Sequence, residues 1–192
     1  MKKLFCEIPC ICVGNIELRK LKLSDAASLR ELTTCDEVYR YLPTFLFEKK
    51  YDAEDAISLM YDECLEHSLI LGVFCDGALC GLFEVYGYNP PFLKVSIGMR
   101  FLPAYWGRGI ATKTIETAVN YLFSETKIRV ITASVMPDNK ASEAVLKKNG
   151  FRCVARGVPG NWGHKLPTIE DKWVIIAKNH HSDYSVGYKE KE

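Results

Sequence analysis

Long apolar runs, an excess of one charge and an export signal are all missing from this sequence. No stretch approaches the roughly 20 apolar residues of a transmembrane helix, and Glu7 and Pro9 interrupt the apolar start that a signal peptide would need. The formal net charge is only +1, and no basic run could form a stripe that neutralises phosphates. We therefore expect a cytoplasmic protein without nucleic-acid or membrane partners.

The chain also does not require disulfides to be stable, although it has eight cysteines. A chain of 192 residues, of which 48% are hydrophobic, can bury a normal core without crosslinks. Cys6, Cys10 and Cys12 cluster near the start, and Cys64 lies three residues before His67. We interpret these cysteines as reduced structural or surface thiols and expect no metal. A metal site is the alternative, although it would require four well-spaced ligands.

The spacing of apolar residues predicts a mixed α/β domain. Alternating or β-branched stretches predict strands over residues 16–23, 69–75, 78–86, 93–102, 128–135, 151–156 and 172–178. Amphipathic stretches predict helices over residues 26–33, 36–41, 52–67, 110–124 and 139–149. We expect a single domain over residues 1–192, with a core of about 16–178 and a polar, flexible tail over 179–192.

The most informative segment joins a predicted strand to a predicted helix and reads Leu102-Pro-Ala-Tyr-Trp-Gly-Arg-Gly-Ile-Ala-Thr112. Glycines at 107 and 109 allow backbone N–H groups to converge on one point without interference from a Cβ atom. The helix that follows adds its unpaired first N–H groups and the positive end of its dipole. The segment therefore predicts a pyrophosphate cradle for a nucleotide-like cofactor, bound through backbone atoms.

A second motif follows about thirty residues later, with Asn139-x-x-Ser142 and then Leu-x-Lys-x-Gly-Phe ending at Phe151. With these two motifs the chain resembles the GNAT superfamily of N-acetyltransferases, and within it the RimJ/RimL type that acts on ribosomal proteins. The resemblance runs from about Ile16 to about Lys178. It implies the acyl-CoA N-acyltransferase (GNAT) fold, a mixed and mostly antiparallel seven-stranded sheet with flanking helices. In that fold the fourth and fifth strands splay apart around the pantetheine arm of acetyl-CoA.

The same resemblance assigns the contacts with acetyl-CoA. In the family's loop motif the first position is usually Gln or Arg, whereas it is Trp106 here, which matters little because backbone atoms hold the phosphates. Asn139 has two interpretations, a helix N-cap or a contact to the pantetheine arm. The full predicted set is Phe101, Leu102, Trp106, Gly107, Arg108, Gly109, Ile110, Ala111, Thr112 and Asn139.

The chemistry implied is direct attack of an amine on the thioester, which agrees with the lack of any recognisable Cys-His or Ser-His arrangement. Many relatives protonate the departing thiolate with a tyrosine, but Leu146 holds that position here. The resemblance therefore points to Ser142 as the acid or as a donor to the sulfur, with an ordinary helix serine as the alternative. Glu84, in an apolar predicted strand, is the candidate base, directly or through water. A solvent-facing strand residue is its alternative, and Ser96 replaces the glutamate that many relatives carry.

For the acceptor, the sequence predicts a primary amine, either a protein N-terminus or a small molecule. No conspicuous acidic cluster lies near the predicted site. Tyr41 and Trp162 are the substrate-binding candidates, with Trp162 in a glycine-flanked loop. Other side chains expected at the entrance, or alternatively in a satellite core, are Phe45, Phe47, Tyr88 and His164. The expected assembly is a monomer or homodimer, and the alternative function is a catalytically silent acyl-CoA-binding regulatory module.

Overall fold

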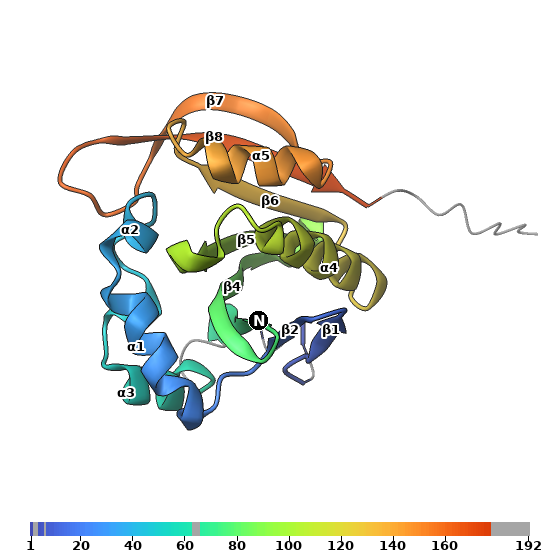
Figure 1. Ribbon diagram of the computed structural model, residues 1–192. Coiled ribbons are helices and arrows are strands. Elements are labelled where there is room, and N and C mark those ends of the chain that lie inside the picture. Colours follow the sequence, from blue (N-terminus) through green and yellow to red (C-terminus); the bar gives the residue numbers. More distant parts are fainter. Residues whose placement is uncertain (2–3, 6, 63–65, 178–192) are drawn as a thin grey trace, which may run out of the picture.

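The computed structural model describes residues 1, 4–5, 7–62 and 66–177, and its centre is one eight-stranded sheet (Figure 1). The strands lie in the order β1-β2-β3-β4-β5-β6-β8-β7. Neighbouring strands pair antiparallel, except for the parallel pair β5–β6. The bounds are β1 Ile11–Val13, β2 Ile16–Arg19, β3 Ser68–Cys75, β4 Ala78–Asn89, β5 Lys94–Phe101, β6 Val130–Val135, β7 Arg152–Gly160 and β8 Thr168–Ile176.

Helices cover both faces of this sheet. Their bounds are α1 Ala26–Thr34, α2 Asp36–Tyr39, α3 Ala53–Met60, α4 Ile110–Ser124 and α5 Lys140–Lys148, with short 3-10 turns at η1 Leu23–Asp25, η2 Phe47–Lys49, η4 Pro90–Phe92 and η5 Pro103–Tyr105. None of the helices in the described ranges is long and apolar enough to span a bilayer.

The expectation of seven strands was wrong by one, because the short strand β1 pairs with β2 at the edge of the sheet. Three residues are too few to show an alternating pattern, so no local pattern indicated β1. The last strand begins at Thr168 rather than at residue 172, and α3 ends at Met60 rather than at residue 67. The predicted tail, residues 179–192, lies outside the described residues.

Local sequence explains where the elements start and stop. Asp76 and Gly77 both have positive φ, 51° and 80°, which is the two-residue hairpin geometry predicted between β3 and β4. The Asn139 side chain accepts a hydrogen bond from the Ser142 N–H at 3.1 Å and caps α5, and Gly150 ends that helix with φ 79°.

Two apolar clusters divide the helices between the faces of the sheet (Figure 1). One cluster joins α4 and α5 to the sheet and includes Phe83, Ile115 and Trp173. The other joins α1 and α3 to the opposite face and includes Leu29 and Leu82. Since side chains alternate along β4, Phe83 faces α4 while its neighbours face the side of α1 and α3.

The sheet opens in its middle. β5 pairs with β6 only through Lys94, Val95 and Ser96, although β5 continues to Phe101 and β6 continues to Val135. Beyond those three pairs, each of the two strands keeps only its antiparallel partner on the other side, β4 or β8. These are the fourth and fifth of the seven expected strands, so the predicted splay lies between β5 and β6.

Candidate functional site

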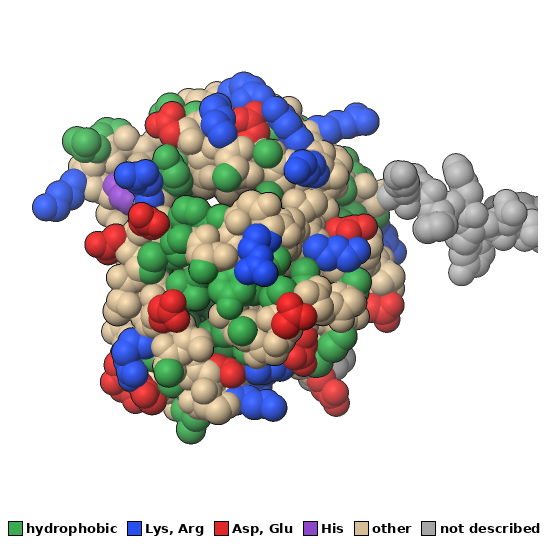
Figure 2. Space-filling view, viewed as in Figure 1, with side chains coloured by type: hydrophobic (Ala, Val, Ile, Leu, Met, Phe, Trp, Pro, Cys, Tyr) green, Lys and Arg blue, Asp and Glu red, His purple; other side chains and the backbone are tan. Residues whose placement is uncertain are grey.

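A cleft of about 1570 Å³ passes through the opening between β5 and β6. Its walls include Gly98 and Met99 from β5, Ser134 from β6, and the first turns of α4 and α5. In Figure 2 apolar side chains gather in the middle of the face, around the segment that leads into α4, and charged side chains of both signs surround them. Because the cleft crosses the sheet, it connects the face covered by α4 and α5 with the face covered by α1 and α3.

The glycine loop lies at one end of this cleft in the geometry that a phosphate cradle requires. Gly107 and Gly109 have φ of 71° and 78°, and a Cβ atom built on either would point into open space. In the part of the chain that the structure describes, no acceptor pairs with the backbone N–H groups of residues 107–112; the first such bond in α4 runs from Lys113 to the Gly109 carbonyl at 3.0 Å. These unpaired donors at a helix start fit an anionic pyrophosphate.

Trp106 supports the loop from the side. Its indole N–H donates to the Phe101 carbonyl at 2.7 Å, while half of the side chain stays exposed, at 51%. Gly107, Gly109, Ile110, Ala111 and Thr112 also line the cleft. Trp106 therefore ties the end of β5 to the cradle.

Two of the predicted cofactor residues do not line the cleft. Leu102 is buried in the cluster beneath α1 and α3, and its N–H donates to the Cys80 carbonyl at 3.0 Å. Arg108 lies over the Tyr105 ring and faces a smaller pocket of about 270 Å³ beside Asp76. The sequence could not separate these two residues from their neighbours, because contact depends on the path of the loop.

The exposed backbone edge of β5 points instead to Ile97 and Met99. The carbonyls of Leu93 and Val95 face β6, where they accept hydrogen bonds from the Arg129 N–H and the Thr132 hydroxyl. Backbone groups alternate along a strand, so those of Ile97 and Met99 face the same way, into the opening. Both residues line the cleft.

Asn139 and Ser142 lie together at the start of α5 and both line the cleft. Asn139 Oδ1 is used as the helix cap, but no hydrogen bond of the described residues uses its side-chain N–H₂. The Ser142 hydroxyl likewise has no hydrogen bond to the described part of the chain, although its backbone N–H is capped. Both interpretations of Asn139 are therefore compatible, since the cap leaves its donors free.

Glu84 lies on β4, on the opposite face of the sheet from Phe83 and Val85, and lines the cleft. Its side chain is 14% exposed, and the Arg100 guanidinium donates to it from Nη1 at 3.2 Å. Arg100 is itself buried and is held by Glu48 of η2, with Nη2 to Oε2 at 2.8 Å and Nε to Oε1 at 2.6 Å. Burial lowers the pKa of Arg100, but Glu48 and Glu84 more than offset this and raise the pKa above its ordinary value.

This three-residue group has one more carboxylate than guanidinium, because the buried Arg100 faces both Glu48 and Glu84. The sequence interpretation missed Glu48 and Arg100. They are 52 residues apart, and nothing in either local pattern indicates burial. The sequence contains only one weak indication that Arg100 is buried, namely that it lies within the apolar predicted strand over 93–102.

A second polar group comes from β8 and the loop before it. Glu170 accepts from the Trp162 indole at 3.1 Å and from Lys172 Nζ at 2.6 Å, and Lys172 also reaches Ser134 on β6 at 3.1 Å. Burial raises the pKa of Glu170, but the hydrogen bonds from Lys172, Ser134 and Trp162 hold it below its ordinary value. Gly160 allows the indole to lie this close, since a Cβ there would approach Trp162 Nε1 to 2.7 Å.

Tyr86 extends toward both carboxylates from the same face of β4 as Glu84. Although 37% exposed, it lies inside the cleft, where desolvation and the charges of Glu84 and Glu170 raise the pKa of its phenol to about 12. The phenol therefore keeps its proton at neutral pH and can act as a hydrogen-bond donor in the cleft.

Two distant loops meet to form the outer wall of the cleft. The Thr44 N–H donates to the Trp162 carbonyl at 2.9 Å, and the Thr44 hydroxyl donates to the Gly163 carbonyl at 3.0 Å. His164 Nε2 lies 2.9 Å from the Leu42 carbonyl. Of the side chains expected at the entrance, five line the cleft, and His164 is used in this loop contact instead. The five are Tyr41, Phe45, Phe47, Tyr88 and Trp162.

Comparison with known proteins identifies this architecture. Residues 15–152 match the family model described as the acetyltransferase (GNAT) domain. The chain belongs to the GNAT acetyltransferase family. The spermidine N(1)-acetyltransferase of Escherichia coli (strain K12) is 27% identical over 139 residues, which cover 71% of this chain and 73% of the relative. The expected fold and the class of enzyme, an N-acetyltransferase, are thereby confirmed.

Solved structures of this GNAT fold include enzymes with different acceptors. The ribosomal L7/L12 alpha-N-protein acetyltransferase RimL in complex with coenzyme A superposes with a TM-score of 0.76 at 17% identity, covering 88% of this chain and 98% of that chain. Spermidine N-acetyltransferase from Vibrio cholerae in complex with CoA and spermine gives 0.69 at 19% identity, covering 84% and 95%. At these identities the likeness shows the shared fold.

Proposed function

We propose that this GNAT enzyme transfers the acetyl group of acetyl-CoA to a primary amine by direct attack. The observation that carries the proposal is the single cleft through the splay of β5 and β6. It brings the cradle of α4 and the start of α5, on one face of the sheet, together with Glu84 and its buried partners, on the other. Such an enzyme must hold a thioester and an amine in one site at attack distance.

The donor half is formed by backbone. The free N–H groups of residues 107–112 would bind the pyrophosphate, and the backbone edge of Ile97 and Met99 would bind the pantetheine arm as an added strand does. The free side-chain donors of Asn139 would reach the same arm. When bound, acetyl-CoA supplies an activated acyl carbon whose leaving group is a thiolate.

In the acceptor half, Glu84 would bind the incoming ammonium group and accept its proton, directly or through water. Arg100 and Glu48 act as positioning residues, because they hold the Glu84 carboxylate on the β4 face of the cleft. The net negative charge of this group favours a cationic acceptor. Ser142, whose hydroxyl is free, would donate to the departing sulfur.

The acceptor class follows from the mixture of charges. Glu84 and Glu170 line the cleft, but Arg40, Lys50 and Lys172 line it too, so the cleft is not uniformly acidic. A polycation would meet several of these cations, whereas a peptide with one terminal ammonium group and a carbonyl-rich backbone fits both signs. We therefore place a protein N-terminus first among acceptors and a small-molecule amine second. The catalytically silent module is set aside, because the family is one of N-acetyltransferases and both halves of a site line one cleft.

The test is a steady-state assay of acetyl-CoA consumption with two acceptors at matched concentrations, a short peptide with a free N-terminus and spermidine. We expect a higher kcat/KM for the peptide than for spermidine. The same peptide with a blocked N-terminus should give no turnover. A higher kcat/KM for spermidine would reverse the order of acceptors, and no turnover with any amine would overturn the proposed activity.

A further inference from the structure

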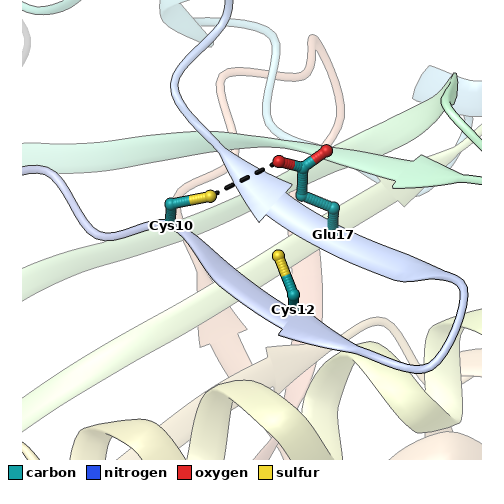
Figure 3. Close-up of side chains that lie close together, drawn as sticks. All are labelled: Cys10, Cys12 and Glu17. Atoms are coloured by element: carbon teal, nitrogen blue, oxygen red, sulfur yellow. Dashed lines mark hydrogen bonds between the residues drawn. The ribbon is translucent and has the colours of Figure 1, made fainter.

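Two exposed thiols and a carboxylate converge on the edge hairpin β1–β2, away from the cleft (Figure 3). The Sγ atoms of Cys10 and Cys12 and a carboxylate oxygen of Glu17 all lie within 4.8 Å of one another. Cys10 Sγ is 3.4 Å from Glu17 Oε1. Around a single tetrahedral Zn²⁺, with Zn–S of about 2.3 Å and Zn–O of about 2.0 Å, sulfur and oxygen ligands lie roughly 3.5 Å apart.

The hairpin fixes this convergence. Cys12 and Glu17 are directly opposite each other in the β1–β2 pairing, and Cys10, two residues before Cys12, lies on the same face. The opposite face carries Ile16 and Leu18, which are buried in the core. A one-residue slip is therefore excluded, because it would expose those core residues and turn the thiols inward.

Arg19 orients the carboxylate in the way that a partner of a metal ligand does. Its Nε lies 3.5 Å from Glu17 Oε2, which leaves Oε1 turned toward the thiols. Arg19 is held in place by two hydrogen bonds to Asp25, at 2.9 and 3.3 Å, and its guanidinium lies 3.5 Å above the centre of the Phe74 ring. Outer contacts of this kind fix the geometry of metal ligands.

We propose that Cys10, Cys12 and Glu17 form a binding site for a thiophilic divalent cation of the Zn²⁺ type, with water in the fourth position. Two thiolates and one carboxylate are ligands that Zn²⁺ and Cd²⁺ prefer, whereas Mg²⁺ and Ca²⁺ require oxygen. The three ligand charges exceed the charge of a divalent cation by one, and Arg19 lies beside Glu17 on the side away from the thiols. Both cysteines are exposed, so the fourth position is open to solvent.

Binding would be coupled to proton release, because a thiol must lose its proton to act as a ligand. The cation displaces the thiol protons into solvent and takes the two thiolates as ligands.

The test uses the full-length chain, reduced with a phosphine and freed of metal, and Co²⁺ as the spectroscopic probe. We expect one Co²⁺ per chain with a thiolate-to-cobalt charge-transfer band, and displacement of the band by Zn²⁺. The double variant Cys10→Ser/Cys12→Ser should lose the band. Glu17→Gln should weaken binding by tenfold or more, by comparison with the roughly 10–100-fold losses known for partners of metal ligands.

The matched controls are Cys35→Ser and Cys153→Ser, which remove half-buried thiols elsewhere and should leave the band unchanged. All variants should retain acetyl transfer, since neither β1 nor β2 lines the cleft. The proposal is overturned if wild type gives no band, if the band survives the double variant, or if a control abolishes it.

Discussion

The donor and acceptor halves of the cleft are built in different ways. The proposed donor half is largely contiguous in sequence, since residues 106–112 would supply the cradle and residues 139–142 contain the start of α5. The acceptor half joins Glu48, Glu84 and Arg100 from three separate elements, and Trp162 and Glu170 from the far end of the chain. The donor half relies on backbone N–H groups, whereas the acceptor half relies on buried charges whose positions depend on tertiary packing.

This difference separates a part of the site that the whole family can share from a part that each member can change. Backbone donors, as proposed here, would recognise any CoA thioester and would depend little on the side chains of the loop. The acceptor half can change its charge with a few substitutions. Mutations in the two halves should therefore change different kinetic constants.

The largest effect on the donor half should come from a substitution at Gly109, which should abolish binding of acetyl-CoA. Gly109→Glu would place an L-residue at φ 78° and direct a carboxylate at the phosphates, so we expect acetyl-CoA binding below detection with the fold retained. Calorimetric titration of CoA measures this. Gly77→Glu is the matched control, because its φ of 80° and open surroundings are the same but it lies in the β3–β4 turn. Unchanged CoA affinity in a folded Gly109→Glu protein would remove the cradle assignment.

The acceptor half should be the part whose charges govern stability. Glu48→Gln leaves the buried Arg100 with only Glu84, and breaking a buried ion pair costs about 3–5 kcal/mol of unfolding free energy. Chemical denaturation of both proteins measures it. The control is Glu54→Gln, which removes a solvent-exposed ion pair with Arg30 and should change the free energy of unfolding far less than Glu48→Gln does. Equal losses of unfolding free energy in the two variants would mean that solvent, and not Glu48, stabilises the charge of Arg100.

Glu84→Gln should lower kcat without lowering acetyl-CoA affinity. The amide keeps an oxygen for Arg100 but cannot accept a proton, so we expect a fall of about 10²–10³ near neutral pH. The deficit should shrink as pH rises and the amine loses its own proton. Glu170→Gln tests the other carboxylate of the cleft and should have the smaller effect on kcat. The opposite ranking would transfer the role of base to Glu170.

The same division explains what the sequence could predict. The helix over 110–124 was predicted with its observed bounds, and Gly109, Asn139 and Ser142 line the cleft, because each follows from a local pattern. Glu84 was predicted to alternate with the buried Phe83 and does so. Arg100 and Glu48 could not be predicted, since their pairing depends on how a loop of the first half packs against β5. Strand β1 was missed because three residues carry no period.

Ser142→Ala should have a moderate effect. Its hydroxyl is free and faces the cleft, and a thiolate with a pKa of roughly 8.5 needs only modest help to leave. We expect kcat to fall about tenfold to a hundredfold, below the ceiling for acid catalysis, with the melting temperature nearly unchanged. A rise in KM for acetyl-CoA would add a role in holding the thioester. Full activity would return Ser142 to an ordinary helix residue.

The smallest effects should distinguish the halves most directly, through two tryptophans that each donate one hydrogen bond. Trp162 donates to Glu170 in the acceptor half, and Trp106 donates to the Phe101 carbonyl beside the cradle. Replacing either with Phe keeps a ring and removes one donor, which changes binding by about two- to tenfold. Trp162→Phe should raise KM for the amine alone, and Trp106→Phe should raise KM for acetyl-CoA alone. If both variants change the same constant, the cleft acts as one unit, and the division into halves is wrong.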